Sequence, residues 1–130
     1  MREIKFRGRV PDKGWLYGDL RHIGKNLIYI VDKFGHGSSV NPNTVEQFTG
    51  MKDSSGREIY EGDIVEISPQ FSAKQGLKRK FHSFAVVRWD ERLARFVVIS
   101  KEILDRIPDS EFVSVIGNIH DNPELLEARA

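Results

Sequence analysis

The chain has 130 residues, of which 39% are hydrophobic and 30% charged, and it contains no Cys. This length fits one domain with a hydrophobic core of its own, and the lack of Cys excludes disulfides, thiolate metal sites and cysteine nucleophiles. No stretch approaches the roughly 20 apolar residues of a membrane helix, and the N-terminus alternates in polarity where a signal peptide would be apolar. We therefore expect a cytoplasmic protein without membrane contact.

The formal net charge of +1 conceals four blocks of alternating sign. Residues 1–30 hold seven basic and three acidic side chains, residues 31–70 three and seven, residues 71–100 seven and two, and residues 101–130 three and seven. Such blocks favour pairing within the fold or across subunits over a nucleic-acid footprint. We expect a homo-oligomer.

Short strands separated by turns are predicted for the first 31 residues. Glu3–Arg7 alternates at period two, with Ile4 and Phe6 on the face expected to be half-buried. Trp15–Leu20 follows a turn and contains Gly18, which in a strand often marks a bulge or a close backbone approach. Leu27–Val31 is a short apolar run that predicts a central strand.

Turn-forming residues dominate the next part of the chain. A loop is predicted over Asp32–Ser39, and Asn41–Thr44 is predicted to be a turn that caps one helical turn reaching Phe48. Further on, Asp53–Gly56 reads as a tight turn.

Glu61–Asp63 reads as a second turn, which contains a Gly-Asp pair and opens directly into a strand, Ile64–Ile67. In small SH3-like barrels such a Gly takes a positive φ, while the Asp side chain accepts hydrogen bonds from nearby backbone N–H groups. We expect both features here.

The second half of the chain continues the strand pattern. The sequence predicts an exposed loop over Ser68–Lys80 and three strands, Phe81–Trp89, Arg95–Ile99 and Glu111–Ile116. It also predicts a short helical turn over Lys101–Arg106 and a helix from Pro123 to about Arg129. The fold class is therefore mainly β, with antiparallel strands in a small SH3-like or related barrel or sheet, short helical turns and a C-terminal helix. We expect one domain over residues 1–130, with sub-parts at 1–58 and 59–130.

Motifs that would carry catalysis are absent from the sequence. No two of the four histidines, His22, His36, His82 and His120, lie within five residues of each other, so no local metal pair exists. Two acidic clusters are present: Asp90–Glu91, and Glu58 with Glu61 and Asp63. They could act in acid–base catalysis or bind a cation, and the competing interpretation is turn formation and charge pairing. The chain has no P-loop and no Gly-x-Ser-x-Gly. We expect no enzyme activity, metal or cofactor.

Basic residues interleaved with phenylalanines form the best candidate binding region. Its members are Lys74, Lys78, Arg79, Lys80, His82, Arg88, Arg92 and Arg95. Cations neutralise phosphates, and the interleaved Phe71, Phe81 and Phe84 could stack on bases. Three interpretations stay open: a solvated loop anchored by its phenylalanines, a nucleic-acid surface, and a protein or subunit contact.

Five segments of the chain resemble the YopX family. They are Met1–Arg7, Trp15–Asp19, Thr44–Asp53, Gly56–Val65 and Val115–Leu126. The resemblance implies a small β-rich, self-associating protein of phages or prophages. The family has no established biochemical activity and no assigned catalytic residues, so none carry over. Ser68–Lys80 matches no family pattern known to us. The function expected is therefore a non-enzymatic, self-associating phage accessory module, with a small nucleic-acid-binding barrel using residues 74–95 as the alternative.

Overall fold

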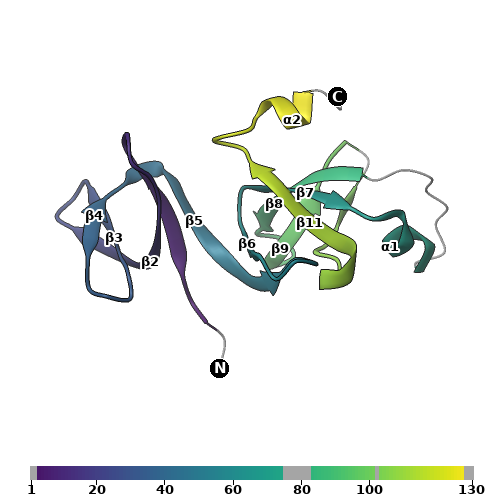
Figure 1. The fold of residues 1–130 in the computed structure, drawn as a ribbon, viewed down its shortest axis with the longest axis horizontal. Coiled ribbons are helices and arrows are strands. Elements are labelled where there is room, and N and C mark those ends of the chain that lie inside the picture. The colour runs from purple at the N-terminus through teal and green to yellow at the C-terminus, as the bar shows by residue number, and fades with distance from the viewer. Residues whose placement is uncertain (1–2, 75–82, 102, 128–130) are drawn as a thin grey trace. The chain divides into compact units, whose positions relative to one another are not determined.

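The computed structural model describes residues 3–74, 83–101 and 103–127. The chain divides into two compact units, Met1–Gly50 (unit 1) and Met51–Ala130 (unit 2). Two sheets are present, with strand orders β4-β3-β2-β1-β5-β6 and β10-β9-β8-β7-β11. Figure 1 shows the chain with most of these strands labelled.

Five strands begin in unit 1: β1 (Phe6–Val10), β2 (Gly14–Ile23), β3 (Leu27–Val31), β4 (Gly37–Ser39) and β5 (Asn41–Lys52). Successive strands pair as antiparallel hairpins, and β5 returns to pair with β1. Ile30, Val40 and Phe48 are the buried apolar side chains of this unit. The core of unit 1 is therefore made by side chains from β3, from β5 and from the residue between β4 and β5.

Gly18 lies where β2 passes the end of β3. A Cβ on this residue would collide with the carbonyl oxygen of Val31. The close backbone approach predicted for this strand glycine is confirmed, because only a residue without a side chain lets the two backbones come this near.

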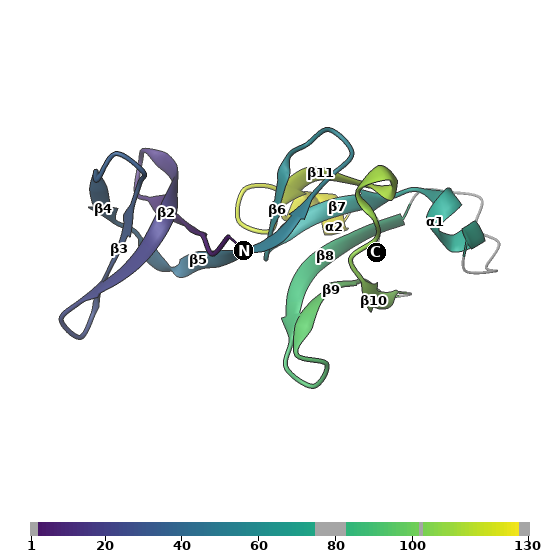
Figure 2. The ribbon, with the colours of Figure 1, turned by 90° about the horizontal axis from the view of Figure 1, so that it is seen from below.

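Unit 2 contains the remaining strands: β6 (Glu58–Tyr60), β7 (Asp63–Ile67), β8 (Ser83–Asp90), β9 (Arg95–Ile99), β10 (Leu104–Arg106) and β11 (Val113–Asn118). Its core contains side chains of β6, β7, β8, β9 and β11 and of helix α1 (Pro69–Lys74). Buried members of this core include Ile59, Val65, Phe71, Val87 and Val98. Figure 2 shows the β8–β9 hairpin extending beyond the other strands of this unit. A 3-10 turn, η1 (Ser110–Phe112), precedes β11, and α2 (Glu124–Glu127) follows it.

The turn before β7 has the geometry expected from the sequence. Gly62 has a φ of 87°, and the Asp63 carboxylate accepts a 2.8 Å hydrogen bond from the N–H of Tyr60. The Gly62 N–H donates to the carbonyl of Val87 at 2.8 Å, and its own carbonyl accepts from the N–H of Ile119 at 3.0 Å. One residue therefore joins this turn to β8 and to the segment after β11.

The prediction of a mainly β, antiparallel fold is confirmed. Over the described residues, the strand orders are open, so the sheets are not closed barrels. Strands Leu27–Val31 and Arg95–Ile99 have the predicted bounds. None of the helices in the described ranges has the length and apolarity needed to cross a bilayer.

Two predicted helical turns are wrong. Residues 45–48 belong to β5, because Glu46 and Gln47 pair with Arg7 and Phe6 of β1. Residues 104–106 form β10, because Leu104 and Arg106 pair with Ile99 and Val97 of β9. In both places cross-strand hydrogen bonds outweigh a weak local preference for a helical turn.

Two other segments also differ from expectation. The first strand starts later than predicted, at Phe6, so Ile4 is exposed and the charged Arg7 is buried. The predicted loop Ser68–Lys80 contains helix α1, and Phe71 of that helix packs in the core, with its ring centroid 6.2 Å from that of Phe112. Burial of one aromatic ring gives this polar stretch its helical turn.

Candidate functional site

The β8–β9 hairpin holds the part of the candidate basic region that the structure describes in full. Its tip is fixed by the Asp90 carboxylate, which accepts a 2.8 Å hydrogen bond from the N–H of Leu93. Ala94 closes the turn with a φ of 53°, in the left-handed region that side chains other than Gly seldom adopt. The loop is therefore ordered by its own backbone chemistry.

Three arginines of this hairpin are exposed: Arg88, Arg92 and Arg95. Arg88 pairs with Val97, and Arg95 pairs with Asp90, so the Arg88 and Arg95 side chains share one face of the two strands. Within the described ranges, the guanidinium groups of these arginines make no ion pair. They are free to meet an anionic partner.

The other predicted members of the region are placed differently. Lys74 is the last residue of α1. Lys78, Arg79, Lys80 and His82 lie outside the described residues, as does Phe81. Phe71 is buried in the core and Phe84 is half-buried, so Phe71 is not available to stack on a base.

Exposed aliphatic side chains border the arginines on the same face. Ile99 of β9 lies opposite Leu104 of β10, and their exposed fractions are 40% and 58%. Ile99 also lies opposite Val86, which lies opposite Ile64, and both of these are buried. An apolar row therefore crosses the sheet and emerges into solvent at its edge strand, β10. Local sequence pattern does not reveal this row, because it predicts a helical turn around Leu104 where the structure has β10.

Arg106 of β10 has partners nearby. Its guanidinium lies 3.3 Å from the Asp109 carboxylate and 5.3 Å from the ring centroid of Phe71. This arginine caps the core at the edge of the sheet and is not equivalent to the three free ones.

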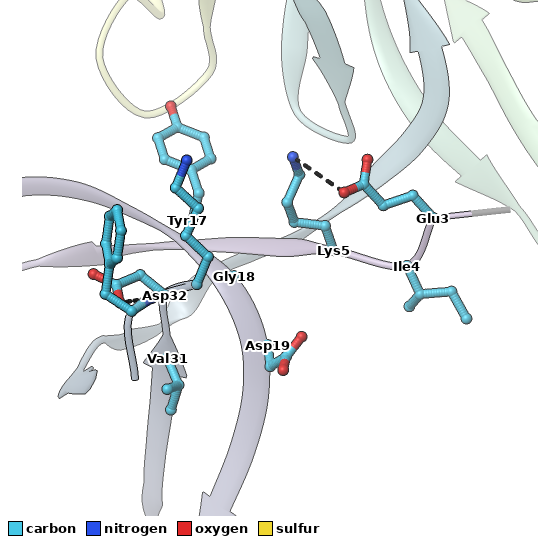
Figure 3. Close-up of a pocket in the computed structure, with 10 residues that line it drawn as sticks. Glu3, Ile4, Lys5, Tyr17, Gly18, Asp19, Val31 and Asp32 are labelled. Atoms are coloured by element: carbon cyan, nitrogen blue, oxygen red, sulfur yellow. Dashed lines mark hydrogen bonds and ion pairs between the residues drawn. The ribbon is translucent and has the colours of Figure 1, made fainter. Parts of the chain in front are cut away.

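A surface hollow of about 380 Å³ lies in unit 1. It is lined by Glu3, Ile4, Lys5, Tyr17, Gly18, Asp19, Val31, Asp32, Lys33 and Phe34. In Figure 3 the Lys5 amine reaches toward Glu3, at 3.8 Å, and Tyr17 extends to the same side, while Asp19 and Ile4 extend to the other. The polar groups of the hollow therefore do not converge on one point.

Carboxylates that could act as acids or bases are engaged in turns. Asp63 and Asp90 each accept a backbone N–H, and Glu58 accepts the hydroxyl of Tyr60 at 3.2 Å. No group of three or more His, Cys, Asp or Glu side chains in the described ranges is arranged to hold a metal ion. Local hydrogen bonds therefore account for Asp63, Asp90 and Glu58 of the acidic clusters noted in the sequence.

Asp53 is a buried carboxylate at the centre of a hydrogen-bonded turn. Its Oδ1 accepts from the N–H groups of Ser55 and Arg57, both at 2.9 Å, and from the Ser55 hydroxyl at 2.8 Å. Its Oδ2 accepts from the N–H of Val115 in β11 at 2.9 Å. Burial raises the pKa of Asp53, but these donors outweigh it and hold the pKa below its ordinary value of 3.8.

Replacing Asp53 by Asn is expected to destabilise unit 2 by about 1.5–3 kcal/mol at neutral pH, because the amide cannot accept from both the turn and Val115. The folded-state pKa is below the unfolded one, so the stabilisation is present above about pH 4 and is lost as the pH falls through the folded value. Urea midpoints measured from pH 7 to pH 3 should fall for the wild type and change less for Asp53→Asn.

A matched control exists in unit 1. Asp32 accepts from the N–H groups of Phe34 and His36 at 2.9 and 3.0 Å in the same Asp-x-x-Gly turn, without a partner strand. Asp32→Asn keeps one acceptor oxygen for both bonds and should stay within about 0.5 kcal/mol of the wild type. The chain has two Trp residues; Trp15 lies in unit 1 and Trp89 in unit 2, so single-Trp variants report on each unit separately. Equal losses in the two variants would contradict the special role of Asp53.

Comparison with known protein families finds a match to the YopX protein family over residues 15–127. The chain belongs to the YopX family. The resemblance noted in the sequence is thereby confirmed. Among solved structures, this YopX protein is similar to the crystal structure of protein EF1440 from Enterococcus faecalis, with 24% sequence identity and a TM-score of 0.57. The similarity covers 97% of this chain and 99% of that one, and it concerns the fold alone. No curated protein matches the chain.

Proposed function

We propose that this YopX protein is a non-enzymatic binding module that associates with further copies of itself and serves a phage or prophage in the bacterial cytoplasm. The observation that carries the proposal is the solvent-exposed pair Ile99 and Leu104 at the edge of the unit 2 sheet. Apolar side chains on an edge strand favour pairing with another chain, since burial removes them from water and the edge has unpaired backbone groups.

Charge supports a second copy as the partner. Residues 71–100, which include Arg88 and Arg95 beside the exposed pair, carry seven basic and two acidic side chains. Residues 31–70 and 101–130 each carry seven acidic and three basic ones. Part of this acidic charge is buried, but exposed residues such as Glu111, Asp121 and Glu124 offer the opposite charge that the basic face of another copy would meet. The engagement of Asp63 and Asp90 in turns supports a role without catalysis.

The mass in solution tests the proposal. Size-exclusion chromatography with light scattering should show a dimer or larger species for the wild type, and Leu104→Lys should raise the dissociation constant at least about tenfold. Ile4→Lys is the matched control, because Ile4 has a 60% exposed side chain in unit 1. A wild type that stays monomeric at high concentration and low salt would rule the proposal out.

Nucleic-acid binding through residues 74–95 is the second candidate function. It is favoured by the exposed guanidinium groups of Arg88 and Arg95, which lie on one face of the hairpin and make no ion pair within the described ranges. Binding of this kind weakens steeply with salt. Failure of both single-stranded and double-stranded probes to bind at low salt would exclude it.

A further inference from the structure

The tip of the β2–β3 hairpin is a two-stranded ribbon that leaves the unit 1 sheet. β1 pairs with β2 only over Gly14–Gly18, and β4 pairs with β3 only over Tyr29–Val31. The outer ends of β2 and β3 therefore have only each other as ladder partners. Every residue from 21 to 27 is exposed, and Figure 2 shows this hairpin reaching past the other strands of unit 1.

Large aliphatic side chains stand at the end of this ribbon. Ile23 and Leu27 are direct cross-strand partners, with exposed fractions of 50% and 51%. Arg21 lies on the same face, because it is two residues from Ile23 in β2 and pairs with Tyr29, two residues from Leu27 in β3. Two half-exposed aliphatic side chains side by side are unfavourable in water, so a partner that covers them would gain binding energy.

The charge of the ribbon is of one sign. Arg21 and Lys25 are basic, His22 lies between them, and no acidic residue occurs from position 20 to position 31. The partner that this pattern fits is anionic and also offers apolar contacts.

We propose that the ribbon tip, residues 21–27, binds duplex DNA in the major groove. The B-form major groove is wide enough for a two-stranded β-ribbon. Arg21 and Lys25 would neutralise phosphates on its walls, while Ile23 and Leu27 would contact the methyl groups of thymines. Double-stranded RNA is disfavoured, since its major groove is too narrow for side chains to read. The surface lies in unit 1 and does not depend on the residues proposed for self-association.

Fluorescence anisotropy with a labelled mixed-sequence duplex tests the proposal. Arg21→Gln combined with Lys25→Gln should lower the slope of log affinity against log salt by about two, because two phosphate contacts are lost. Ile23→Ser combined with Leu27→Ser should weaken binding about tenfold with the slope unchanged, since those side chains touch no phosphate. Trp15 fluorescence checks that unit 1 stays folded. If a double variant unfolds, the single variant Lys25→Gln, in the exposed turn, replaces it in the test.

Arg88→Gln combined with Arg95→Gln is the matched control, with the same loss of charge in unit 2. Loss of duplex binding in that variant, with the ribbon variants behaving as wild type, overturns the inference but leaves the second candidate function standing. Absence of duplex binding by the wild type overturns the inference, and the second candidate function then depends on the single-stranded probe. Stronger binding to anionic lipid vesicles or to double-stranded RNA than to the DNA duplex also overturns the inference.

Discussion

Gly62→Val is expected to destabilise unit 2 by about 3–5 kcal/mol, through a strained left-handed backbone and the loss of the hydrogen bonds made there. Gly62 is buried at a φ of 87°. Its N–H and C=O groups bridge Val87 and Ile119. A β-branched side chain is poorly tolerated at positive φ, so the turn must change shape and both bridges must shift. Unfolding followed by Trp89 fluorescence in a Trp15→Phe background measures the effect.

Gly56→Ala separates backbone strain from the loss of the bridges. Gly56 has a φ of 85°, nearly that of Gly62, and a Cβ there would meet no atom within 4 Å. Its replacement should cost only about 1–2 kcal/mol, the price of an L-residue in the left-handed region. A melting curve for Gly62→Val that matches the wild type would show that the turn is wrongly placed.

Arg7→Ala is expected to destabilise unit 1 by about 3–5 kcal/mol, because it leaves the Glu46 carboxylate buried without its charge partner. The Arg7 Nε and Nη2 atoms both donate to Glu46 Oε1, at 3.0 and 2.9 Å. The two side chains are 5% and 7% exposed, and the guanidinium lies 4.8 Å from the Trp15 ring centroid. The pair joins β1 to β5 at directly opposed positions.

The double variant Arg7→Met with Glu46→Leu distinguishes an unpaired charge from lost packing. Replacing both partners by apolar side chains of similar volume is often neutral or stabilising, so this variant should recover most of the loss. The unfolding midpoint is read from Trp15 in a Trp89→Phe background. A double variant as unstable as Arg7→Ala would show that packing on Trp15, and not burial of a lone charge, is the main contribution.

Local patterns in the sequence were enough to predict most strands and two turns. Strand Leu27–Val31 has five consecutive apolar residues, which are too few for a stable helix and rich in strand-forming types. The Gly62–Asp63 turn needed only a positive φ and a side-chain acceptor close in the chain, and both are properties of those two residues. The family resemblance rested on the same short runs.

Contacts between distant residues were beyond the reach of such patterns. Arg7 and Glu46 are 39 positions apart, and Asp53 and Val115 are 62 apart, so neither pair leaves a local signature. The Asn41–Thr44 cluster does make turn-like bonds, such as Asn43 N–H to the Asn41 side chain at 3.0 Å, but inside a strand with a register shift opposite β1. The sequence showed the donors and acceptors without showing which ladder would use them.

The candidate site divides in the same way. Composition and charge blocks by themselves determined the basic character of residues 71–100 and the absence of catalytic motifs. Only the tertiary structure decided that Phe71 is in the core, that Arg88 and Arg95 share a face, and that Ile99 and Leu104 emerge together at an edge. The physical reason is that side-chain direction in a strand is local and alternates, whereas burial depends on which strands pair and in which register.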